Sequence, residues 1–141
     1  MADTGISSLI SKIHADSASF LKAELQARGL PDMVSSHGNI LFQLSQAGTL
    51  SMKELSERIH RDKSTTTALV NKLEAAGFVA RAKDSADSRI THISLTETGK
   101  NYNDVLCAIS ATLNERCCQG LTEAEKQTLF NLLSRISENF N

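Results

Sequence analysis

Residues 51–95 read SMKELSERIHRDKSTTTALVNKLEAAGFVARAKDSADSRITHISL. The first four form a Ser-x-x-Glu capping box, whose two side chains satisfy orphaned backbone N–H groups and start a helix. A polar corner, residues 60–63, interrupts the helical period, and a second helix runs from residue 64 to about residue 76. Two short helices joined in this way are typical of a helix-turn-helix. The side chains expected to face the core are Met52, Leu55, Ile59, Leu69, Val70 and Leu73.

The pattern changes from helical to alternating after Gly77. Residues 78–83 predict a strand, residues 84–87 a turn, and residues 90–95 a returning strand. A hairpin that directly follows a helix-turn-helix is a wing. The sequence therefore predicts a winged helix-turn-helix, in a fold that is mostly α-helical with a small β wing.

Two helices are expected before this motif. Residues 7–27 carry apolar side chains at helical spacing, and Gly29 and Pro31 then end the helix. A second helix covers residues 36–46, and residues 49–50 are expected to connect it to the capping box.

Two more helices are expected after the wing. Thr96 caps a fifth helix, which ends near Gly120, and residues 122–125 form another capping box that opens a sixth. Both helices carry apolar side chains at i, i+3 and i+4 spacing, so each has one apolar face to bury.

Length and charge narrow the class of protein. A chain of 141 residues suits one domain over residues 1–141. Residues 52–89 carry eight Lys and Arg against six Asp and Glu, whereas the rest carries seven against ten. A modestly basic middle suits a phosphate-facing surface, although a solvated mixed-charge face has the same composition. The sequence shows no secretory signal at its start and no apolar run near the ~20 residues of a membrane span, so we expect a cytosolic protein without a membrane partner.

Cysteine and histidine spacing predicts no metal site. Cys107, Cys117 and Cys118 lack CxxC or ordered Cys/His spacing, and we expect buried, reduced thiols on helices. The four histidines are scattered, and we expect each to be structural or exposed. The sequence has no Gly-rich phosphate loop, nucleophile elbow or metal motif, so we expect no cofactor, no catalytic residues and no enzyme.

Four features of the sequence occur together. They are DKSTTT at residues 62–67 with LVNKLE at 69–74 and GFV at 77–79, the wing tip DSADSR at 84–89, the closure LTETG at 95–99, and one N-terminal and two C-terminal helices around the winged motif. With these features the chain resembles the MarR family of bacterial regulators over essentially its whole length.

The resemblance implies an obligate homodimer, in which the first, fifth and sixth helices of two subunits interleave. On that basis residues 34–95 form the DNA-binding lobe, and residues 6–28 and 97–140 form the dimerisation helices. The residues agree, because apolar stripes at the chain ends have few partners in so small a chain, and exposed apolar patches usually mark interfaces. The expected dimerisation residues are Leu9, Ile13, Leu129, Leu132, Leu133, Ile136 and Phe140.

The second helix of a helix-turn-helix enters the major groove, with its N-terminal residues nearest the base edges. Hydroxyls and free backbone N–H groups at residues 64–67 suit phosphates and base edges, Asn71 suits adenine, and Lys72 suits phosphate. Ala68 departs from the family, because many members have a longer polar or basic residue there. A neutral solvated face is the alternative for the threonine run. The predicted DNA contacts of this helix are Lys63, Ser64, Thr65, Thr67, Ala68, Asn71 and Lys72.

The wing carries Asp87 and Arg89, two residues apart and so on one face of a strand. The resemblance to the MarR family implies that Arg89 enters the minor groove and that Asp87 holds it in position. A narrow A·T-rich minor groove favours arginine through its enhanced negative potential. Arg81 and Lys83 are expected to add phosphate contacts. The alternative is an exposed ion pair worth ~0–1 kcal/mol with no other role.

Three functions remain open at this point. The first is a dimeric repressor that reads an inverted repeat in double-stranded DNA and is released by a small aromatic or lipophilic effector, as in many relatives. The second is a thiol-based redox regulator that uses the cysteines, although this chain lacks the first-helix cysteine of peroxide-sensing relatives. The third is a winged domain that binds only protein partners. The residues that would line an effector pocket are not predicted by the sequence.

Overall fold

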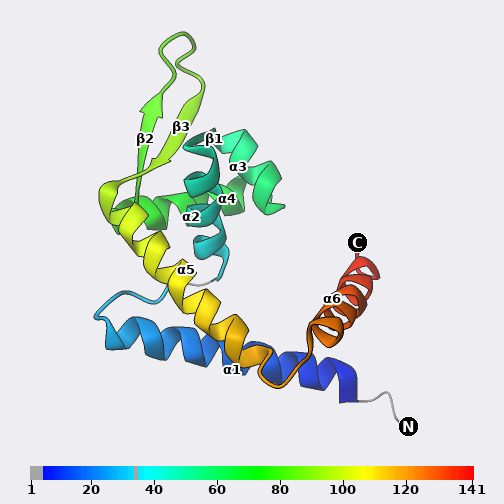
Figure 1. Ribbon diagram of the computed structural model, residues 1–141. Helices are drawn as coiled ribbons and strands as arrows, with labels where there is room; N and C mark the ends of the chain where they lie inside the picture. The colour runs from blue at the N-terminus through cyan, green and yellow to red at the C-terminus, as the bar shows by residue number, and fades with distance from the viewer. Residues whose placement is uncertain (1–4, 34) are drawn as a thin grey trace.

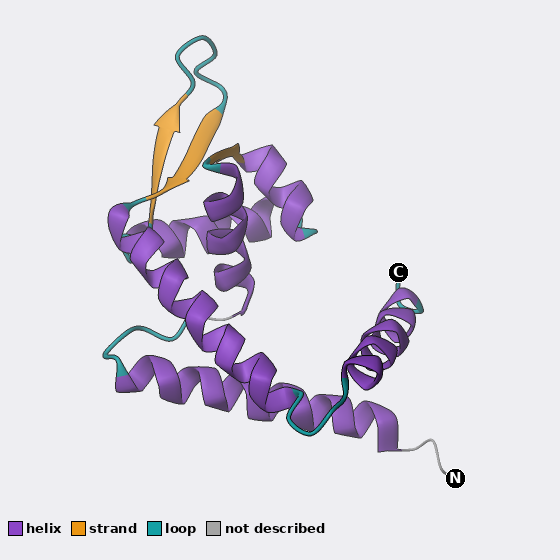
Figure 2. Cartoon of the chain, viewed as in Figure 1, coloured by secondary structure: helices purple, strands orange, loops and turns teal. Residues whose placement is uncertain are grey.

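The computed structural model describes residues 5–33 and 35–141 (Figure 1). The expected fold class is confirmed, since helices dominate and the strands form one small wing sheet (Figure 2). Residue 34, where the expected DNA-binding lobe begins, lies outside the described residues. The elements in chain order are α1 (Ile6–Ala27), α2 (Ser35–Ala47), β1 (Thr49–Ser51), α3 (Met52–Ile59), α4 (Lys63–Ala75), β2 (Val79–Lys83), β3 (Thr91–Leu95), α5 (Glu97–Cys117) and α6 (Glu123–Glu138).

The wing sheet has three antiparallel strands in the order β1-β3-β2. Ile93 in the central strand lies opposite Leu50 on one side and Arg81 on the other. The expectation that residues 49–50 only connect two helices is wrong, because they begin β1. Three residues are too few to show alternation, and this strand forms only through its distant partner β3.

Helix starts follow the capping residues. The Ser51 hydroxyl accepts from the Glu54 N–H at 3.1 Å, and a Glu54 carboxylate oxygen accepts from the Ser51 N–H at 3.0 Å. Thr122 and Glu125 form the same reciprocal pair at the start of α6. The fourth helix begins one residue earlier than predicted, because Asp62 is its N-cap. Both predicted capping boxes are confirmed.

One core joins the winged lobe to the first part of α5. The Tyr102 ring stacks on Phe78 with centroids 4.5 Å apart, and its hydroxyl donates to the Pro31 carbonyl at 2.5 Å. Met52 and Leu69, both expected to face the core, are half-buried at its edge. The fully buried apolar side chains include Leu25, Ile40, Leu41, Leu44, Leu55, Val70, Leu73, Ile93 and Ile109.

The start of α5 approaches the backbone before β2 closely. The Thr96 N–H donates to the Phe78 carbonyl at 3.1 Å, and the Thr96 hydroxyl donates to the Gly77 carbonyl at 2.6 Å. A Cβ at position 99 would lie 1.9 Å from the Phe78 carbonyl oxygen. Glycine at position 99 therefore lets the helix pack directly against this backbone.

The ends of the chain leave apolar surface without a partner. Figure 1 shows α6 standing away from the winged lobe, and it buries no side chain in the single chain. Leu9 and Ile13 on α1 are also exposed. Among the described helices, none has the length and apolar character to cross a bilayer.

Candidate nucleic-acid interface

The N-terminal turn of α4 is shaped by its own hydrogen bonds. Asp62 accepts from the Thr65 N–H at 2.7 Å, which holds the pKa of this carboxyl below its ordinary value. Thr66 is buried, and the Thr67 hydroxyl donates to the Lys63 carbonyl at 2.8 Å. The predicted contact residues that remain exposed on this helix are Lys63, Ser64, Thr65, Ala68, Asn71 and Lys72, whereas Thr67 is half-buried.

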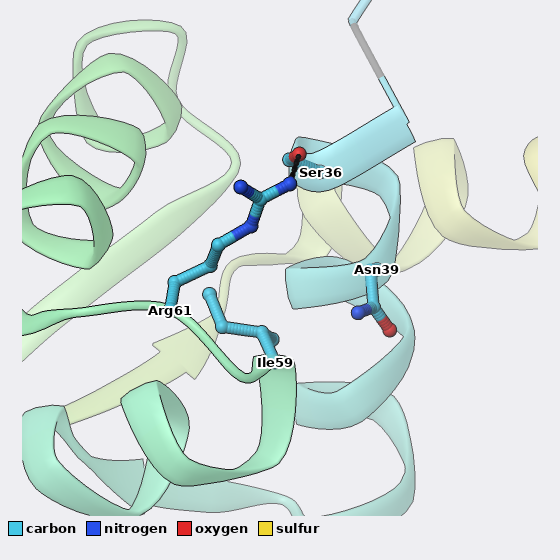
Figure 3. A pocket seen from close by; sticks show the side chains of 4 residues that line it. All are labelled: Ser36, Asn39, Ile59 and Arg61. Carbon is cyan, nitrogen blue, oxygen red and sulfur yellow. Dashed lines mark hydrogen bonds between the residues drawn. The ribbon is translucent and has the colours of Figure 1, made fainter. Parts of the chain in front are cut away.

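The turn between α3 and α4 is tied to the start of α2. His60 ends α3 in the left-handed conformation, at φ 55°. The Arg61 guanidinium then reaches back to the Ser36 hydroxyl at 3.5 Å, beside Asn39 and Ile59 (Figure 3). These four residues line a small open hollow of about 290 Å³. Arg61 therefore links the turn before α4 to the start of α2.

Asp84 organises the wing tip. Its carboxylate accepts from the Ala86 N–H at 3.0 Å, from the Asp87 N–H at 2.9 Å, and contacts His92 Nε2 at 2.8 Å. The His92 hydrogen bond, followed by the two backbone N–H groups, holds the pKa of Asp84 below its ordinary value. The sequence predicted only a turn at Asp84, because its partner His92 lies on the opposite strand.

Arg89 projects from the wing tip. Its Nε and Nη2 atoms donate to the two Asp87 carboxylate oxygens, each at 3.0 Å, and its backbone N–H also donates to Asp87. The guanidinium is planar and paired at two points, so its direction is fixed. The side chain is nevertheless 89% exposed. The wing thus presents an oriented cation at its end.

Comparisons with known proteins agree with this geometry. The MarR family model matches residues 35–91, which include α4 and the wing tip. The HTH-type transcriptional regulator SarZ of Staphylococcus epidermidis is 34% identical over 103 residues, which cover 72% of this chain and 68% of that protein. The chain belongs to the MarR family.

Solved structures give the same fold for this MarR-family chain. The PcaV transcriptional regulator of Streptomyces coelicolor, in complex with its natural ligand, superposes with a TM-score of 0.83 at 20% identity, covering 100% of this chain and 97% of that one. A mutant of MarR from E. coli, complexed with operator DNA, has a TM-score of 0.77 at 21% identity and covers 94% of both chains. At these identities the two structures show the shared fold.

Arg81 connects the wing to α4. Its guanidinium donates to the Asn71 amide oxygen and lies 3.4 Å from a Glu74 carboxylate oxygen. Arg81 is therefore half-buried between the two elements. The Asn71 oxygen that it contacts is the atom that would accept a hydrogen bond from adenine. Lys83 is exposed and forms no ion pair with a described residue. Of the two wing-strand cations, Lys83 is the freer one to meet a phosphate.

A pocket lies between α1, α2 and α5 of this MarR-family protein. Its volume is about 760 Å³, and its wall includes His14, Asp32, Asn103 and Cys107. Leu21, Leu25, Phe42 and Leu106 give the wall its apolar part. No residue of an effector cleft could be predicted from the sequence, because these side chains come together only when three distant helices pack.

The predicted dimerisation residues form no interface within one chain. Leu9, Ile13, Leu129, Leu132, Leu133 and Phe140 are exposed, and Ile136 is half-buried. Phe130 on α6 is also exposed and was not predicted. Several large apolar side chains thus face outward on the two terminal helices.

The cysteines differ from expectation. Cys107 and Cys117 are exposed and Cys118 is half-buried, so the prediction of three buried thiols is wrong for the single chain. Ile109 is the last core residue on α5, so Cys117 and Cys118 lie beyond the core. Within residues 5–33 and 35–141, no three His, Cys, Asp or Glu side chains are grouped as metal ligands.

His37 is the buried histidine of the DNA-binding lobe. It is 4% exposed, and neither ring nitrogen has a hydrogen-bond partner among the described residues. Burial, followed by the charge of Lys72 on α4, holds the pKa of His37 below its ordinary value of 6.5. The folded protein therefore favours the neutral ring.

Acidification is expected to destabilise the fold through His37. Below pH 6.5 the unfolded chain binds a proton at this position that the folded chain resists, so stability falls as pH decreases, by at most ~1.4 kcal/mol per pH unit. Urea unfolding at several pH values measures the slope. His37→Leu should flatten it and the exposed-site control His14→Ala should not; equal slopes for wild type and His37→Leu would contradict the assignment.

Proposed function

We propose that this protein is a homodimeric transcription repressor that binds an inverted-repeat operator in duplex DNA. Each subunit places α4 in the major groove and Arg89 in the adjacent minor groove. A small aromatic or lipophilic molecule binds the pocket between α1, α2 and α5 and releases the dimer from DNA.

The observation that carries this proposal is the oriented, exposed guanidinium of Arg89. An arginine braced by a carboxylate enters a narrow groove with little further loss of side-chain freedom. The exposed N-terminal turn of α4 adds neutral donors, Ser64 and Thr65, beside Lys63. A MarR mutant of the same fold in complex with operator DNA supports DNA binding by this fold.

The exposed apolar faces of α1 and α6 support a dimer. A two-fold interface presents the same patch on both subunits, so an apolar stripe along a terminal helix can pair with its own copy. Residues 6–28 and 97–140 would form this interface, and residues 34–95 would form the DNA-binding lobe. Two lobes related by a two-fold axis read half-sites about one helical turn, ~34 Å, apart.

Leu133→Asp is expected to weaken self-association at least about 100-fold, because each of two subunits would bury an unpaired carboxylate. Sedimentation equilibrium measures this. Gln127→Asp makes the same charge change on an exposed part of α6 outside the predicted stripe and serves as the control. If Leu133→Asp dimerises like the control, this part of α6 does not form the interface.

The pocket supports regulation by a small molecule, and the PcaV regulator of the same fold is in complex with its natural ligand. The relatives are regulators, and we propose that this protein has no catalytic activity of its own. A repressor works where the chromosome lies, so we place it in the cytoplasm.

Binding of labelled DNA from upstream of the protein's own gene tests the proposal. The purified dimer is titrated with this duplex and with a scrambled duplex at several salt concentrations. We expect preference for the native fragment that persists as salt weakens phosphate contacts. Equal affinity for both duplexes at every salt concentration would contradict sequence-specific binding at this locus.

Thiol-based regulation has one observation in its favour, since Cys107 is exposed and lines the pocket. Peroxide would then lower the DNA affinity of the wild type and leave Cys107→Ser unchanged. The proposal of a non-covalent effector expects the same DNA affinity with and without peroxide for both proteins.

A further inference from the structure

The pocket between α1, α2 and α5 lacks the cationic side chains that would bind an acid, among the residues that the structure describes. Its ionisable lining side chains are His14, Asp32 and Cys107, and no Lys or Arg among the described residues lines it. Asp32 is the carboxylate among the described residues that line it. A bound carboxylate ligand would therefore lose hydration without gaining a lysine or arginine partner, and it would face Asp32.

Asn103 is one of the polar residues in the pocket wall. It lies on α5, lines the cavity and is only 6% exposed. No hydrogen bond joins its side-chain amide to another described residue. Because Asn103 lines the cavity, its amide can hydrogen-bond to a polar atom that enters there. One amide offers both a donor and an acceptor.

The remaining wall favours an apolar ligand body. Leu21 and Leu25 on α1, Phe42 on α2 and Leu106 on α5 line the cavity. Ligand sites of this kind combine an apolar wall with a small number of polar groups that set orientation. In this pocket Asn103 is a neutral group of that kind.

We propose that the pocket binds an uncharged ligand with an apolar ring body and an amide- or hydroxyl-type head, which hydrogen-bonds to Asn103. The inference rests on the proposed effector function, whose small-molecule class it narrows. Asp32 acts as a filter, because its negative charge opposes acids of the same shape.

Isothermal titration calorimetry with 2-naphthamide and 2-naphthoate tests the proposal, since the two probes share a ring body and differ in head charge. We expect the amide to bind the wild-type dimer at least about 10-fold more tightly than the carboxylate. Asn103→Leu should weaken amide binding by about 10-fold. Asn101→Leu replaces an exposed asparagine of the same helix outside the pocket and should leave it unchanged.

A second variant tests the filter separately. Asp32→Asn should improve the affinity for 2-naphthoate and leave that for 2-naphthamide nearly unchanged. Cys107 lines the pocket and Cys117 does not, so bound amide should slow iodoacetamide labelling of Cys107 only.

Several outcomes would overturn the inference. They are equal or tighter binding of the carboxylate, full amide affinity in Asn103→Leu, equal labelling of Cys107 with and without amide, and no heat with either probe. These measurements use no DNA. A protein that binds the amide but not its operator would contradict the proposed function alone, and a specific operator binder that prefers the acid would contradict this inference alone.

Discussion

Arg89→Ala is expected to weaken operator binding by about 30-fold or more while the dimer stays folded. An arginine contact to a base edge is worth about 1–3 kcal/mol, and a dimer loses two of them. Arg89 is almost fully exposed, and its hydrogen bonds to described residues are all with Asp87 in the same turn, so its loss leaves the core intact. Fluorescence anisotropy with labelled operator measures the affinity, and circular dichroism measures the helix content.

Lys100→Ala is the matched control for Arg89→Ala. It also removes one exposed positive charge. The Lys100 ammonium lies 3.8 Å from a Glu97 carboxylate oxygen at the start of α5. An exposed pair of this kind is worth little. If both variants lose the same affinity, Arg89 acts only through net charge and the wing does not enter the groove.

Gly99→Ala is expected to lower the free energy of unfolding by about 3 kcal/mol or more. The new Cβ would lie 1.9 Å from the Phe78 carbonyl oxygen, and a backbone atom cannot turn aside as a flexible side chain does. Helix α5 would have to move away from residues 77–78. That movement would break the two Thr96 hydrogen bonds and disturb the Phe78–Tyr102 stack. Urea unfolding followed by circular dichroism measures the loss.

Gly38→Ala provides the comparison, because its Cβ would meet only Leu106 Cδ1, at 3.8 Å. Alanine is a better helix former than glycine by up to ~1 kcal/mol, so Gly38→Ala should be neutral or stabilising. If Gly99→Ala is as stable as Gly38→Ala, the close approach of α5 to residue 78 is not required for the fold.

The sequence was informative wherever local chemistry decides structure. The capping boxes at Ser51 and Thr122 predicted where α3 and α6 begin, because their hydrogen bonds lie within a few residues. The alternation in the sequence predicted the starts of β2 and β3 to within one residue. The family resemblance added the expected Asp87–Arg89 contact, which the structure contains as a two-point ion pair.

Features that depend on distant partners were missed. β1 exists only because it pairs with β3, and the Asp84–His92 contact joins two strands. Arg81 was expected to be free for phosphate, yet it is engaged by Asn71 and Glu74 on α4. Each of these contacts requires the three-dimensional packing of elements, which spacing along the chain does not reveal.

The pocket and the terminal helices were predictable to different extents. Apolar stripes on α1 and α6 predicted an unsatisfied surface, and these side chains are exposed in the single chain. The pocket had no sequence signal, because Asn103 and Asp32 are ordinary polar residues until packing places them in one wall. The exposure of Cys107 also depends on this packing, so the sequence wrongly predicted a buried thiol there.

Tethered cleavage of operator DNA tests most directly whether the wing enters the minor groove. An iron chelate is attached to Ser88→Cys, next to Arg89, in a protein whose three natural cysteines are serines, and the same chelate on Gln127→Cys in α6 is the control. We predict two clusters of cuts in the minor groove, placed symmetrically about the operator centre and absent with the control. A protein that binds the operator but cuts no more strongly from position 88 than from position 127 would contradict the account.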